Sequence, residues 1–564
     1  MRQIPYGDVN FKKIRTQNLL YVDKTMYIEA LEKNPQREKS IYLRPRRFGK
    51  SLFTSMLTYY YSVDEADEFE KLFKGLYIYD NPTENKNNYY VLNFNFSGLT
   101  ISQNNIIEDG KNAFYNAVKD SLTDFINKYK LSIELEGDSA SDILRNLLVK
   151  FKNLNLKHKI YIIIDEYDNF TNAMLKGDAQ DFLDLVNKNG YVRAFYEVIK
   201  MKLEDGIIAR FFATGVMPVT LDNLTSGFNI ATKLSTDPDF TSMIGFTHEE
   251  VRQIVEEVVP IEDVEKVYND LKENYDGYRF SDDSEEKTFN STLVMYYLSN
   301  YITRKEPPKK LLDSNMNTSG DKIKRIVELI KPEENYKTVN EILFNNEVSG
   351  RLKDVILDST EYSKNDLITM LFHLGYITIS SAGMQTKFTI PNAITRSIYS
   401  EYLAELLKIR EGYKIETDRI TDAIVDLGEN GNIQATVELI KDFLVHCSNR
   451  DTENFSEMVL KHVFITFLSL SNQFIVYGEY PAKQGFVDVF VAKTSSSMAT
   501  YEAIIELKYL SKEKAKSVDK DRLLEDGRIQ LTKYVEDKRL LQKEHLKKYV
   551  IIFTGFDDVV VEEM

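Results

Sequence analysis

Residues 42–51, YLRPRRFGKS, place three residue types in an order that can hold a phosphate group. Gly49 lets the backbone approach an anion closely, Lys50 supplies positive charge, and the Ser51 hydroxyl can ligate Mg²⁺. The preceding run SIYL suits a strand, and the following SLFTSMLTYYY suits a helix with one apolar face. The alternative is that Gly-Lys-Ser stands at a helix start by chance.

Two residues at the entrance of this loop depart from the pattern G-x-x-x-x-G-K-[ST]. Arg44 stands where the first glycine belongs, and Pro45 lacks a backbone N–H. Arg46 and Arg47, together with Arg44, could offset these losses by attracting phosphate. The loop therefore predicts a phosphate site with an altered entrance.

A second feature lies in KIYIIIDEYDNF, residues 159–170, where an apolar strand ends in two acids. Asp165 could orient Mg²⁺, and Glu166 could polarise the attacking water. A strand that merely ends in an acidic loop is the alternative. Because the loop and a later strand ending in Asp-Glu rarely follow each other by chance, together they predict ATP (or GTP) binding with Mg²⁺ at Ser51 and Asp165.

A third strand, ARFFATG (209–215), ends near Thr214. This hydroxyl could sense the γ-phosphate, or the residue could be an ordinary threonine at a strand end. The predicted catalytic residue of this site is Glu166. The predicted nucleotide-binding residues are Arg46, Arg47, Phe48, Gly49, Lys50, Ser51, Asp165 and Thr214.

Near the C-terminus, GFVDVFVAK contains Asp488, and YEAIIELKYL contains Glu506 and Lys508. Residues two apart on a strand share a face, so Glu506 and Lys508 project together. Their apolar neighbours indicate a central strand, where charges are costly unless used, although alternating charge on an exposed strand is the alternative. The two carboxylates could hold Mg²⁺ or Mn²⁺, and the lysine could position an attacking water, as a phosphodiesterase requires.

Other residues could assist this second site. Glu457, on the preceding helix, could supply a further metal-directed carboxylate. Gln530 and Tyr534, four apart on the following helix, share a face that could cover the site. Residues 508–548 hold 13 Lys and Arg against 8 Asp and Glu, a local charge of +5 that could steer nucleic acid or be only a solvated helix face. The basic residues include Lys512, Lys514, Lys516 and Arg522.

The elements that must position these residues form three groups. Up to about residue 220, continuous apolar runs alternate with helical patterns, which predicts an α/β domain with a parallel sheet covered on both faces. Its predicted strands are 40–43, 89–94, 159–165 and 209–215. Residues 245–392 are mainly helical and end in a helix and two strands that would fit a winged-helix unit. The last group predicts the order αβββαβ, with helices 453–471 and 518–541 and strands 473–480, 485–492, 501–508 and 548–554.

Composition limits the class of protein. The 564 residues are 43 % hydrophobic and 28 % charged, which is typical of a globular protein, and the length predicts about three domains. A net charge of −15 argues against indiscriminate coating of nucleic acid. The single cysteine, Cys447, and the absence of a signal-like start or a membrane-length apolar run lead us to expect a cytoplasmic protein that does not contact membrane.

With these motifs in place, the chain resembles bacterial and archaeal fusions of an AAA-ATPase-like domain with a C-terminal PD-(D/E)xK nuclease domain. The resemblance covers nearly the whole length and includes YVDKT, RPRRFGKS, IIIDEYD, ATGVMP, GFTHEEV, NYDGYRF, LGYITI, GEYPAKQGFVDVFVA and IIELKY. It implies that the arginine at position 44 is a family trait. A basic residue often follows the glycine of G-x-x-D in such nucleases, and Phe486 stands there instead.

The resemblance implies three domains: a P-loop AAA-ATPase-like domain (1–244), a helical lid with a winged-helix-like region (245–410), and a restriction-endonuclease-like domain (411–564). It implies an ATPase joined to a Mg²⁺-dependent nuclease that acts on nucleic acid, with DNA favoured, in defence or mobile-element biology. A homo-oligomer is compatible with it. The alternatives are a nucleotide-dependent switch whose nuclease fold only binds nucleic acid, and a structural domain without chemistry.

The segment NYDGYRF, residues 274–280, is rich in aromatic side chains for a solvated helix. We expect it to lie near the interface between the two active domains. Local packing around a tight turn at Gly277 is the alternative.

Overall fold

A computed structural model of the chain describes residues 2–99, 106–169, 190–218, 231–312, 319–329, 332–344, 346–354, 363–410, 417–447, 456–470, 473–494 and 497–564. The chain forms two compact units. The first comprises Met1–Lys305, Arg325–Asn335 and Ser349–Pro391, and the second comprises Glu306–Lys324, Tyr336–Val348 and Asn392–Met564. The predicted domain limits at residues 244 and 410 stay a prediction.

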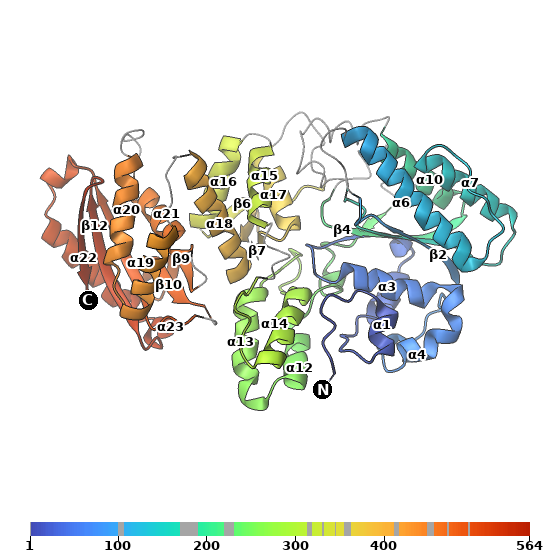
Figure 1. The fold of residues 1–564 in the computed structure, drawn as a ribbon, viewed down its shortest axis with the longest axis horizontal. Coiled ribbons are helices and arrows are strands. Elements are labelled where there is room, and N and C mark those ends of the chain that lie inside the picture. The colour runs from blue at the N-terminus through green and yellow to red at the C-terminus, as the bar shows by residue number, and fades with distance from the viewer. Residues whose placement is uncertain are drawn as a thin grey trace. The chain divides into compact units, whose positions relative to one another are not determined.

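A five-stranded parallel sheet forms the centre of the first unit (Figure 1). Its order is β2-β3-β4-β1-β5, and the four predicted strands are all present. The strands are β1 (Lys39–Leu43), β2 (Tyr89–Asn95), β3 (Lys159–Asp165), β4 (Ile208–Gly215) and the short β5 (Thr232–Lys233). Because β1 pairs with β4 and β4 with β3, the ends of these strands bring the predicted loop and acids to one edge of the sheet.

Helices cover both faces of this sheet, which explains why its strands are continuously apolar. In Figure 1, α6, α7 and α10 lie on one side and α1, α3 and α4 on the other. Their bounds are α1 (Phe11–Thr16), α3 (Lys50–Tyr61), α4 (Phe69–Phe73), α6 (Ile106–Tyr129), α7 (Ala140–Asn153) and α10 (Tyr191–Glu204), with the short α2 (Met26–Glu32) and α5 (Tyr77–Asp80) beside them.

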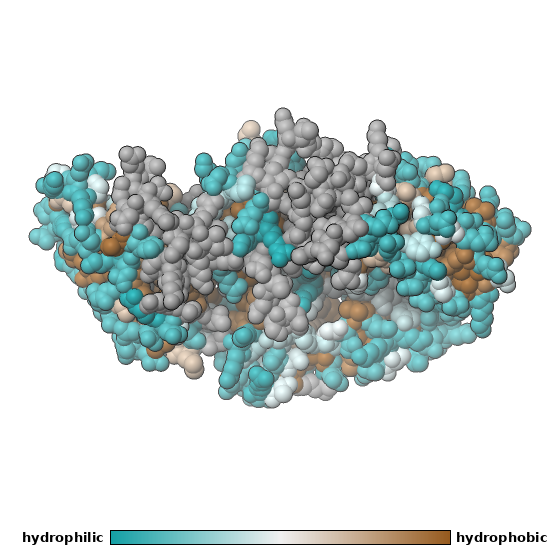
Figure 2. All heavy atoms as spheres, turned by 45° about the horizontal axis from the view of Figure 1, so that its top comes forward, coloured by the Kyte–Doolittle hydropathy of each residue, from teal (hydrophilic) through white to brown (hydrophobic). Residues whose placement is uncertain are grey.

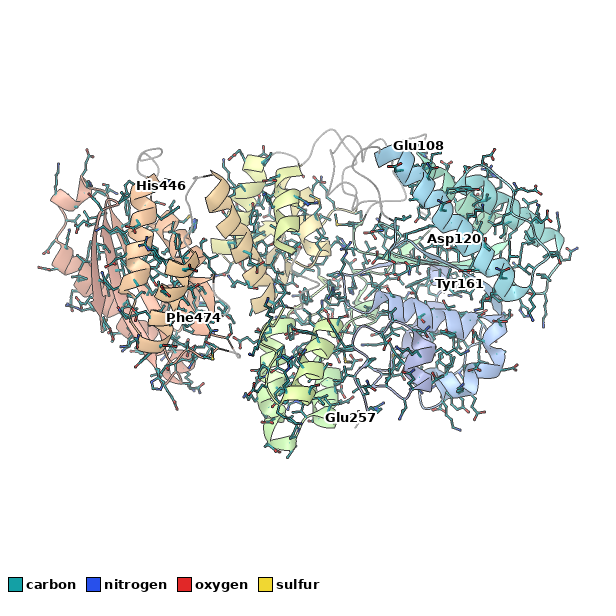
Figure 3. All side chains as sticks on the ribbon, in the orientation of Figure 1. Glu108, Asp120, Tyr161, Glu257, His446 and Phe474 are labelled. Carbon is teal, nitrogen blue, oxygen red and sulfur yellow. The ribbon has the colours of Figure 1, made fainter. Side chains whose placement is uncertain are left out.

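Aromatic side chains fill the layer between the sheet and α3. Tyr161 on β3 is labelled in Figure 3, and its ring meets those of Tyr61 and Tyr89 edge to face at 5.0 and 5.7 Å. The buried Arg210 guanidinium lies 5.8 Å from the Tyr161 ring. These rings fix the height of α3 over the sheet, and therefore the position of the loop that precedes it.

The rest of the first unit contains helices followed by a small hairpin. A capping box between Thr247 and Glu250 begins α12 (His248–Val258), and α13 (Val264–Tyr275) and α14 (Ser291–Arg304) follow. Then α17 (Lys364–His373) leads into the antiparallel pair β7 (Thr378–Ser381) and β8 (Thr386–Thr389). The predicted helix and its two following strands are thus present, and their assignment as a winged-helix-like unit stays a prediction. A third strand, β6 (Val348–Gly350), adjoins β8.

The segment 274–280 packs within the first unit. The Tyr278 and Phe280 rings lie edge to face with the Phe48 ring at 5.0 and 5.6 Å. Arg279 is 2 % exposed and donates to the backbone carbonyls of Ser281, Asp282 and Ser284. These contacts support the alternative of local packing around the turn at Gly277.

The second unit confirms the order αβββαβ and adds one strand. Its sheet has the order β13-β12-β11-β10-β9, with β11 and β12 parallel and the other pairs antiparallel. Its elements are α18 (Ala393–Arg410), α19 (Thr417–Asn430), α20 (Gln434–Cys447), α21 (Glu457–Leu468), β9 (Phe474–Ala482), β10 (Gly485–Lys493), β11 (Glu502–Leu510), α22 (Lys520–Tyr534), α23 (Lys538–Leu541), β12 (Leu546–Thr554) and β13 (Asp558–Glu563). Two further helices, α15 (Ser319–Leu329) and α16 (Pro332–Phe344), contribute residues to both units.

Two helices pack against opposite faces of this second sheet. Leu531 of α22 belongs to an apolar cluster with Val550 and Ile552 of β12. Phe464 of α21 instead meets Phe553, the next residue on β12, at 6.2 Å. Since successive residues of a strand face opposite sides, α21 and α22 enclose the sheet, with the predicted carboxylates between them.

Hydrophobic residues on the face shown in Figure 2 form small patches among hydrophilic ones. Within the described ranges, no helix is both long enough and apolar enough to cross a membrane. Polar groups, rather than one broad apolar area, therefore dominate the part of this face that is coloured by hydropathy.

Gly277 offers a test of this packing. Its φ of +98° favours glycine, and a Cβ there would lie 2.2 Å from the Pro391 carbonyl oxygen. Gly277→Ala should therefore destabilise the first unit by about 2 kcal/mol or more, seen as a lower Tm in calorimetry. Gly383→Ala is the matched control, since its new Cβ would meet only the Gln385 carbonyl oxygen at 3.8 Å. Equal Tm values for both variants would contradict this account of the turn.

Candidate nucleotide and nuclease sites

The phosphate loop ends at the N-terminus of α3. Gly49 is the cap residue and has φ +102°, a backbone conformation that other residues rarely adopt. Lys50 begins the helix and is 6 % exposed, and its ammonium donates to the carbonyls of Arg44 and Pro45 at 2.9 Å. Burial lowers the pKa of Lys50 to about 8, although Asp168, Asp165 and Glu166 oppose the shift. A charged lysine held inside the loop suits phosphate binding.

Gly245 and the start of α14 donate hydrogen bonds to two carbonyl groups of the loop. Phe48 O accepts from the Gly245 N–H at 3.1 Å and from the Ser291 hydroxyl at 2.7 Å, and Arg47 O accepts from the Thr292 N–H at 3.2 Å. Arg47 itself has φ +68°, a strained conformation for a residue with a Cβ. These contacts hold the carbonyl groups of Arg47 and Phe48 in place.

Arg44 has a different role from the one predicted. Its side chain is 1 % exposed and donates to the carbonyls of Leu43, Ser235 and Thr241 at 2.9, 2.7 and 3.1 Å. Its guanidinium also lies 4.0 Å from the Phe280 ring. The expectation that Arg44 attracts phosphate is therefore wrong, because backbone carbonyls and aromatic rings already surround its charge. Arg46, by contrast, is exposed, and Arg47 is half-buried.

The Ser51 hydroxyl and the Asp165 carboxylate meet at the end of β3. Burial raises the pKa of Asp165, while a hydrogen bond from Ser51 and the charge of Lys50 oppose the rise. Glu166 follows at φ +53°, and burial raises its pKa against the charge of Arg46. A pocket of about 400 Å³ adjoins Ser51 and Asp165. The structure thus brings together Lys50, Ser51, Asp165 and Glu166, as an NTPase would require.

Thr214 and Asp168 connect the neighbouring strand ends. Thr214 is fully buried and donates its hydroxyl to the Tyr42 carbonyl at 2.8 Å, a geometry that supports the alternative of a structural threonine. Asp168 is 4 % exposed and accepts from the backbone N–H groups of Val216 and Met217. The sequence reasoning assigned no role to Asp168, although its position three residues after Asp165 was visible.

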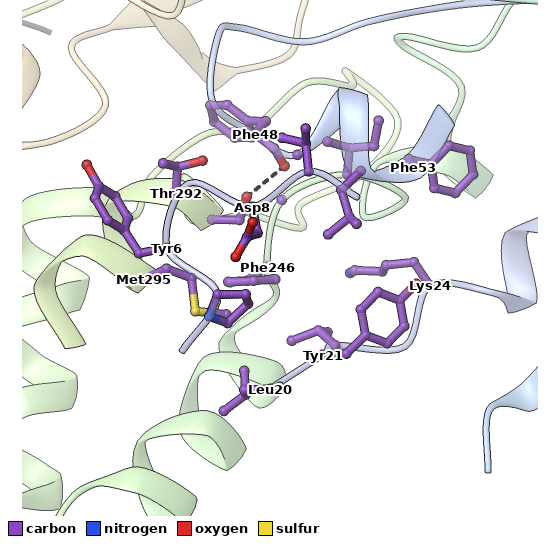
Figure 4. Close-up of a pocket in the computed structure, with 18 of the residues that line it drawn as sticks. Tyr6, Asp8, Leu20, Tyr21, Lys24, Phe48, Phe53, Phe246, Thr292 and Met295 are labelled. Carbon is purple, nitrogen blue, oxygen red and sulfur yellow. Dashed lines mark hydrogen bonds between the residues drawn. The ribbon is translucent and has the colours of Figure 1, made fainter. Parts of the chain in front are cut away.

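An apolar pocket adjoins Gly49 (Figure 4). It is lined by Tyr6 and Asp8 of the N-terminal segment, by Phe48, and by Phe246 and Met295 of the middle region. Such a pocket beside a phosphate loop could take the base of a nucleotide. Sequence reasoning missed it because its walls come from segments almost 300 residues apart.

Asp488 and Glu506 lie where β10 and β11 separate, since the paired residues of these strands end at Val489 and Ile505. Asp488 Oδ2 accepts from the Leu507 N–H at 2.8 Å. Glu506 is 1 % exposed, and its Oε1 accepts from the Lys508 ammonium at 2.7 Å. Burial and the charge of Asp488 raise the pKa of Glu506 to about 7. All three predicted residues therefore meet in one site.

Two residues that the sequence reasoning missed complete this cluster. Lys461 on α21 lies 2.5 Å from Asp488 Oδ1 and 2.6 Å from Glu479 Oε1. Glu457, one turn before Lys461, is 3.9 Å from the same ammonium. The spacing of Glu457 and Lys461 on one helix face was readable, but the pairing of Glu479 with Asp488 across the strands was not.

The other predicted nuclease residues lie on α22. Tyr534 is buried, and burial and the charges of Glu506 and Asp488 raise its pKa. A Cβ at Gly485 would lie 3.2 Å from its ring, so a glycine lets the start of β10 approach this helix. Gln530, one turn earlier, is half-buried. Phe486 is 57 % exposed.

The described residues contain no group of three or more His, Cys, Asp or Glu side chains arranged to hold a metal ion. Two carboxylates with water can nevertheless hold Mg²⁺. Glu506 Oε2 is buried and has no hydrogen-bond partner among the described residues, so an oxygen ligand is available beside Asp488. The donors at this site therefore fit a hard divalent cation.

Known proteins and family models resemble parts of this chain. A curated relative, "Uncharacterized protein in vnfD 5'region" from Azotobacter chroococcum mcd 1, is 26 % identical over 299 residues, which are 52 % of each chain. The chain thus spans about half the length of that relative. A crystal structure of Cdc6p from Pyrobaculum aerophilum aligns over 72 % of this chain and 96 % of its own, at 12 % identity and a TM-score of 0.23. Residues 5–225 match the family model "Predicted AAA-ATPase". Residues 455–563 match the PD-(D/E)XK nuclease superfamily. The chain is thus a fusion of an AAA-ATPase-like domain with a C-terminal domain of the PD-(D/E)XK nuclease superfamily.

Proposed function

We propose that the first unit binds and hydrolyses ATP. The observation that carries this proposal is that Ser51 and Asp165 line one pocket next to the buried Lys50. Loop 46–51 would hold the phosphates, and the apolar pocket of Tyr6 and Phe246 would take the base.

The residues of the loop would divide the work of hydrolysis. Lys50 would bind the outer phosphates, and Ser51 and Asp165 would hold Mg²⁺, which neutralises charge on the phosphates. Glu166 would accept a hydrogen bond from the attacking water and orient it. Burial raises the pKa of Glu166, which makes its carboxylate a better proton acceptor.

We further propose that the second unit is a metal-dependent nuclease. Asp488 and Glu506 would hold Mg²⁺ or Mn²⁺, with Glu457 nearby, and the metal would lower the charge barrier of phosphodiester cleavage. Lys508 would orient the attacking water, and Gln530 and Tyr534 would limit the site on the α22 side. The basic residues Lys512, Lys514, Lys516 and Arg522 favour a polyanionic substrate, for which DNA is the form proposed.

A second candidate function is a nucleotide-dependent switch whose nuclease fold binds nucleic acid without cleaving it. The ion pair between Lys461 and Asp488 favours this candidate, since it neutralises a predicted metal ligand. Either function would suit defence or mobile-element biology in the cytoplasm.

Lys50→Ala should abolish ATP binding in calorimetry, because the loop then loses the charge that faces the phosphates. Glu166→Gln should retain binding and lose hydrolysis, measured as phosphate release. Equal ATP affinity of the wild type and Lys50→Ala would contradict the proposed nucleotide site.

Arg44→Gly would restore the glycine of the usual loop pattern. It tests whether ATP binding depends on that pattern or on the contacts that Arg44 makes. Because three carbonyls would lose their donor and the Phe280 ring its contact, this variant should lower the Tm and weaken ATP binding. Tm is read by calorimetry, with Arg46→Gly as the control for an exposed loop arginine. Tighter ATP binding at unchanged Tm would show that Arg44 only obstructs the loop.

Asp488→Asn keeps an acceptor for the Leu507 N–H and removes the negative charge. DNA cleavage with Mg²⁺ or Mn²⁺, followed on gels, should fall by about a hundredfold or more, while ATP turnover stays unchanged. Metal-dependent cleavage at the wild-type rate would place the nuclease elsewhere. No cleavage by either protein, together with retained DNA binding, would support the switch.

A further inference from the structure

Three carboxylates converge on one ammonium group in the second unit. Lys461 Nζ lies 2.5 Å from Asp488 Oδ1, 2.6 Å from Glu479 Oε1 and 3.9 Å from Glu457 Oε1. The side chains of Lys461 and Asp488 are 15 % and 8 % exposed, whereas those of Glu479 and Glu457 are 39 % and 38 % exposed. The buried partner of Lys461 is therefore Asp488, and its two other partners lie closer to solvent.

Both carboxylate oxygens of Asp488 already have a partner, so a metal ion that binds Asp488 must disturb one of these contacts. Its Oδ2 accepts the Leu507 N–H, and its Oδ1 contacts Lys461. A divalent cation bound to Oδ1 and to the available Glu506 Oε2 would stand within a few ångströms of the ammonium. Two cations on one oxygen repel strongly in a buried site, so one must leave.

Glu479 is placed to receive the displaced ammonium. It stands opposite Asp488 between the paired residues Gly478–Val489 and Tyr480–Val487, and its φ of +48° is unusual for a residue with a Cβ. Strain of this kind is often kept where a side chain must point in one direction. Here the side chain contacts Lys461 on its more exposed side.

We propose that Lys461 is a displaceable internal cation that sets the divalent-metal affinity of the site. The ammonium leaves Asp488 Oδ1 when metal binds and stays paired with Glu479, with Glu457 as a further partner. Glu479 is thus a positioning residue that acts through Lys461. This inference rests on the proposed metal site and not on cleavage.

Calcium binding to the full-length protein, measured by calorimetry without nucleotide, tests this proposal. Lys461→Met should raise the calcium affinity of the site by about tenfold or more, because the competing charge is gone. Lys461→Arg should stay near the wild type. Lys520→Met is the matched control, since Lys520 belongs to the same domain and pairs with Asp558 at 2.8 Å, and it should change affinity less than twofold. Binding that survives in Asp488→Asn belongs to other sites and is subtracted.

A double-mutant cycle separates the role of Glu479 from that of a direct ligand. Glu479→Gln should weaken calcium binding in the wild-type background and have no effect in Lys461→Met. Weakening in both backgrounds would make Glu479 a metal ligand and overturn its assigned role. Unchanged or weaker binding by Lys461→Met would overturn the proposal for Lys461.

A measurement on unmutated protein covers the case in which Lys461→Met does not fold. After reductive ¹³C-methylation of lysines, the Lys461 methyl resonance should shift on calcium addition, while that of Lys520 should not. An unshifted Lys461 resonance at saturating calcium would refute displacement. If calcium displaces the Lys461 ammonium but the protein does not cleave DNA, the proposed nuclease activity is contradicted. The inference on Lys461 is then unaffected.

Discussion

The buried guanidinium of Arg44 is the contact on which the nucleotide end of the first unit depends. A charge that is 1 % exposed must be surrounded by acceptors, and here the carbonyls of Leu43, Ser235 and Thr241 supply them. Through these bonds one side chain connects the end of β1 with the segment after β5. The rings of Tyr42 and Phe280 enclose the same group at 4.3 and 4.0 Å. A residue that the sequence pattern would assign to phosphate binding thus instead holds the end of β1 in place.

The second unit meets the same requirement by a different arrangement. Lys461 and Lys508 each donate to one oxygen of a buried acid, so both Asp488 and Glu506 have a basic partner. Removal of one member of such a pair leaves the other uncompensated, which costs more than the pair contributes. Replacing one member of either pair should therefore destabilise the region where β10 and β11 separate.

The sequence could predict whatever depends on local pattern. The strands around Ile163 and Ile505 are continuous apolar runs, and the carboxylates at their ends were recognisable by type and spacing. The strand β5 was not predicted, because two residues are too few to show a hydrophobic period. The strand β13 was not predicted, because three of its residues are acidic. The expected helix 518–541 is two helices, since the Asp537 side chain accepts the Arg539 N–H and begins a new one. The roles of Arg44, Lys461 and Glu479 depend on contacts between distant segments, and no local pattern contains them.

The carbonyls of the phosphate loop accept hydrogen bonds from residues that lie outside the predicted P-loop domain. Every residue that the sequence motifs predict to contact nucleotide lies before position 244, yet the donors to Arg47 O and Phe48 O are Gly245, Ser291 and Thr292. A chain that ended at residue 244 would keep the motif and lose the groups that shape it. The part of the chain that holds the loop in its conformation is therefore longer than the part that carries its sequence motif.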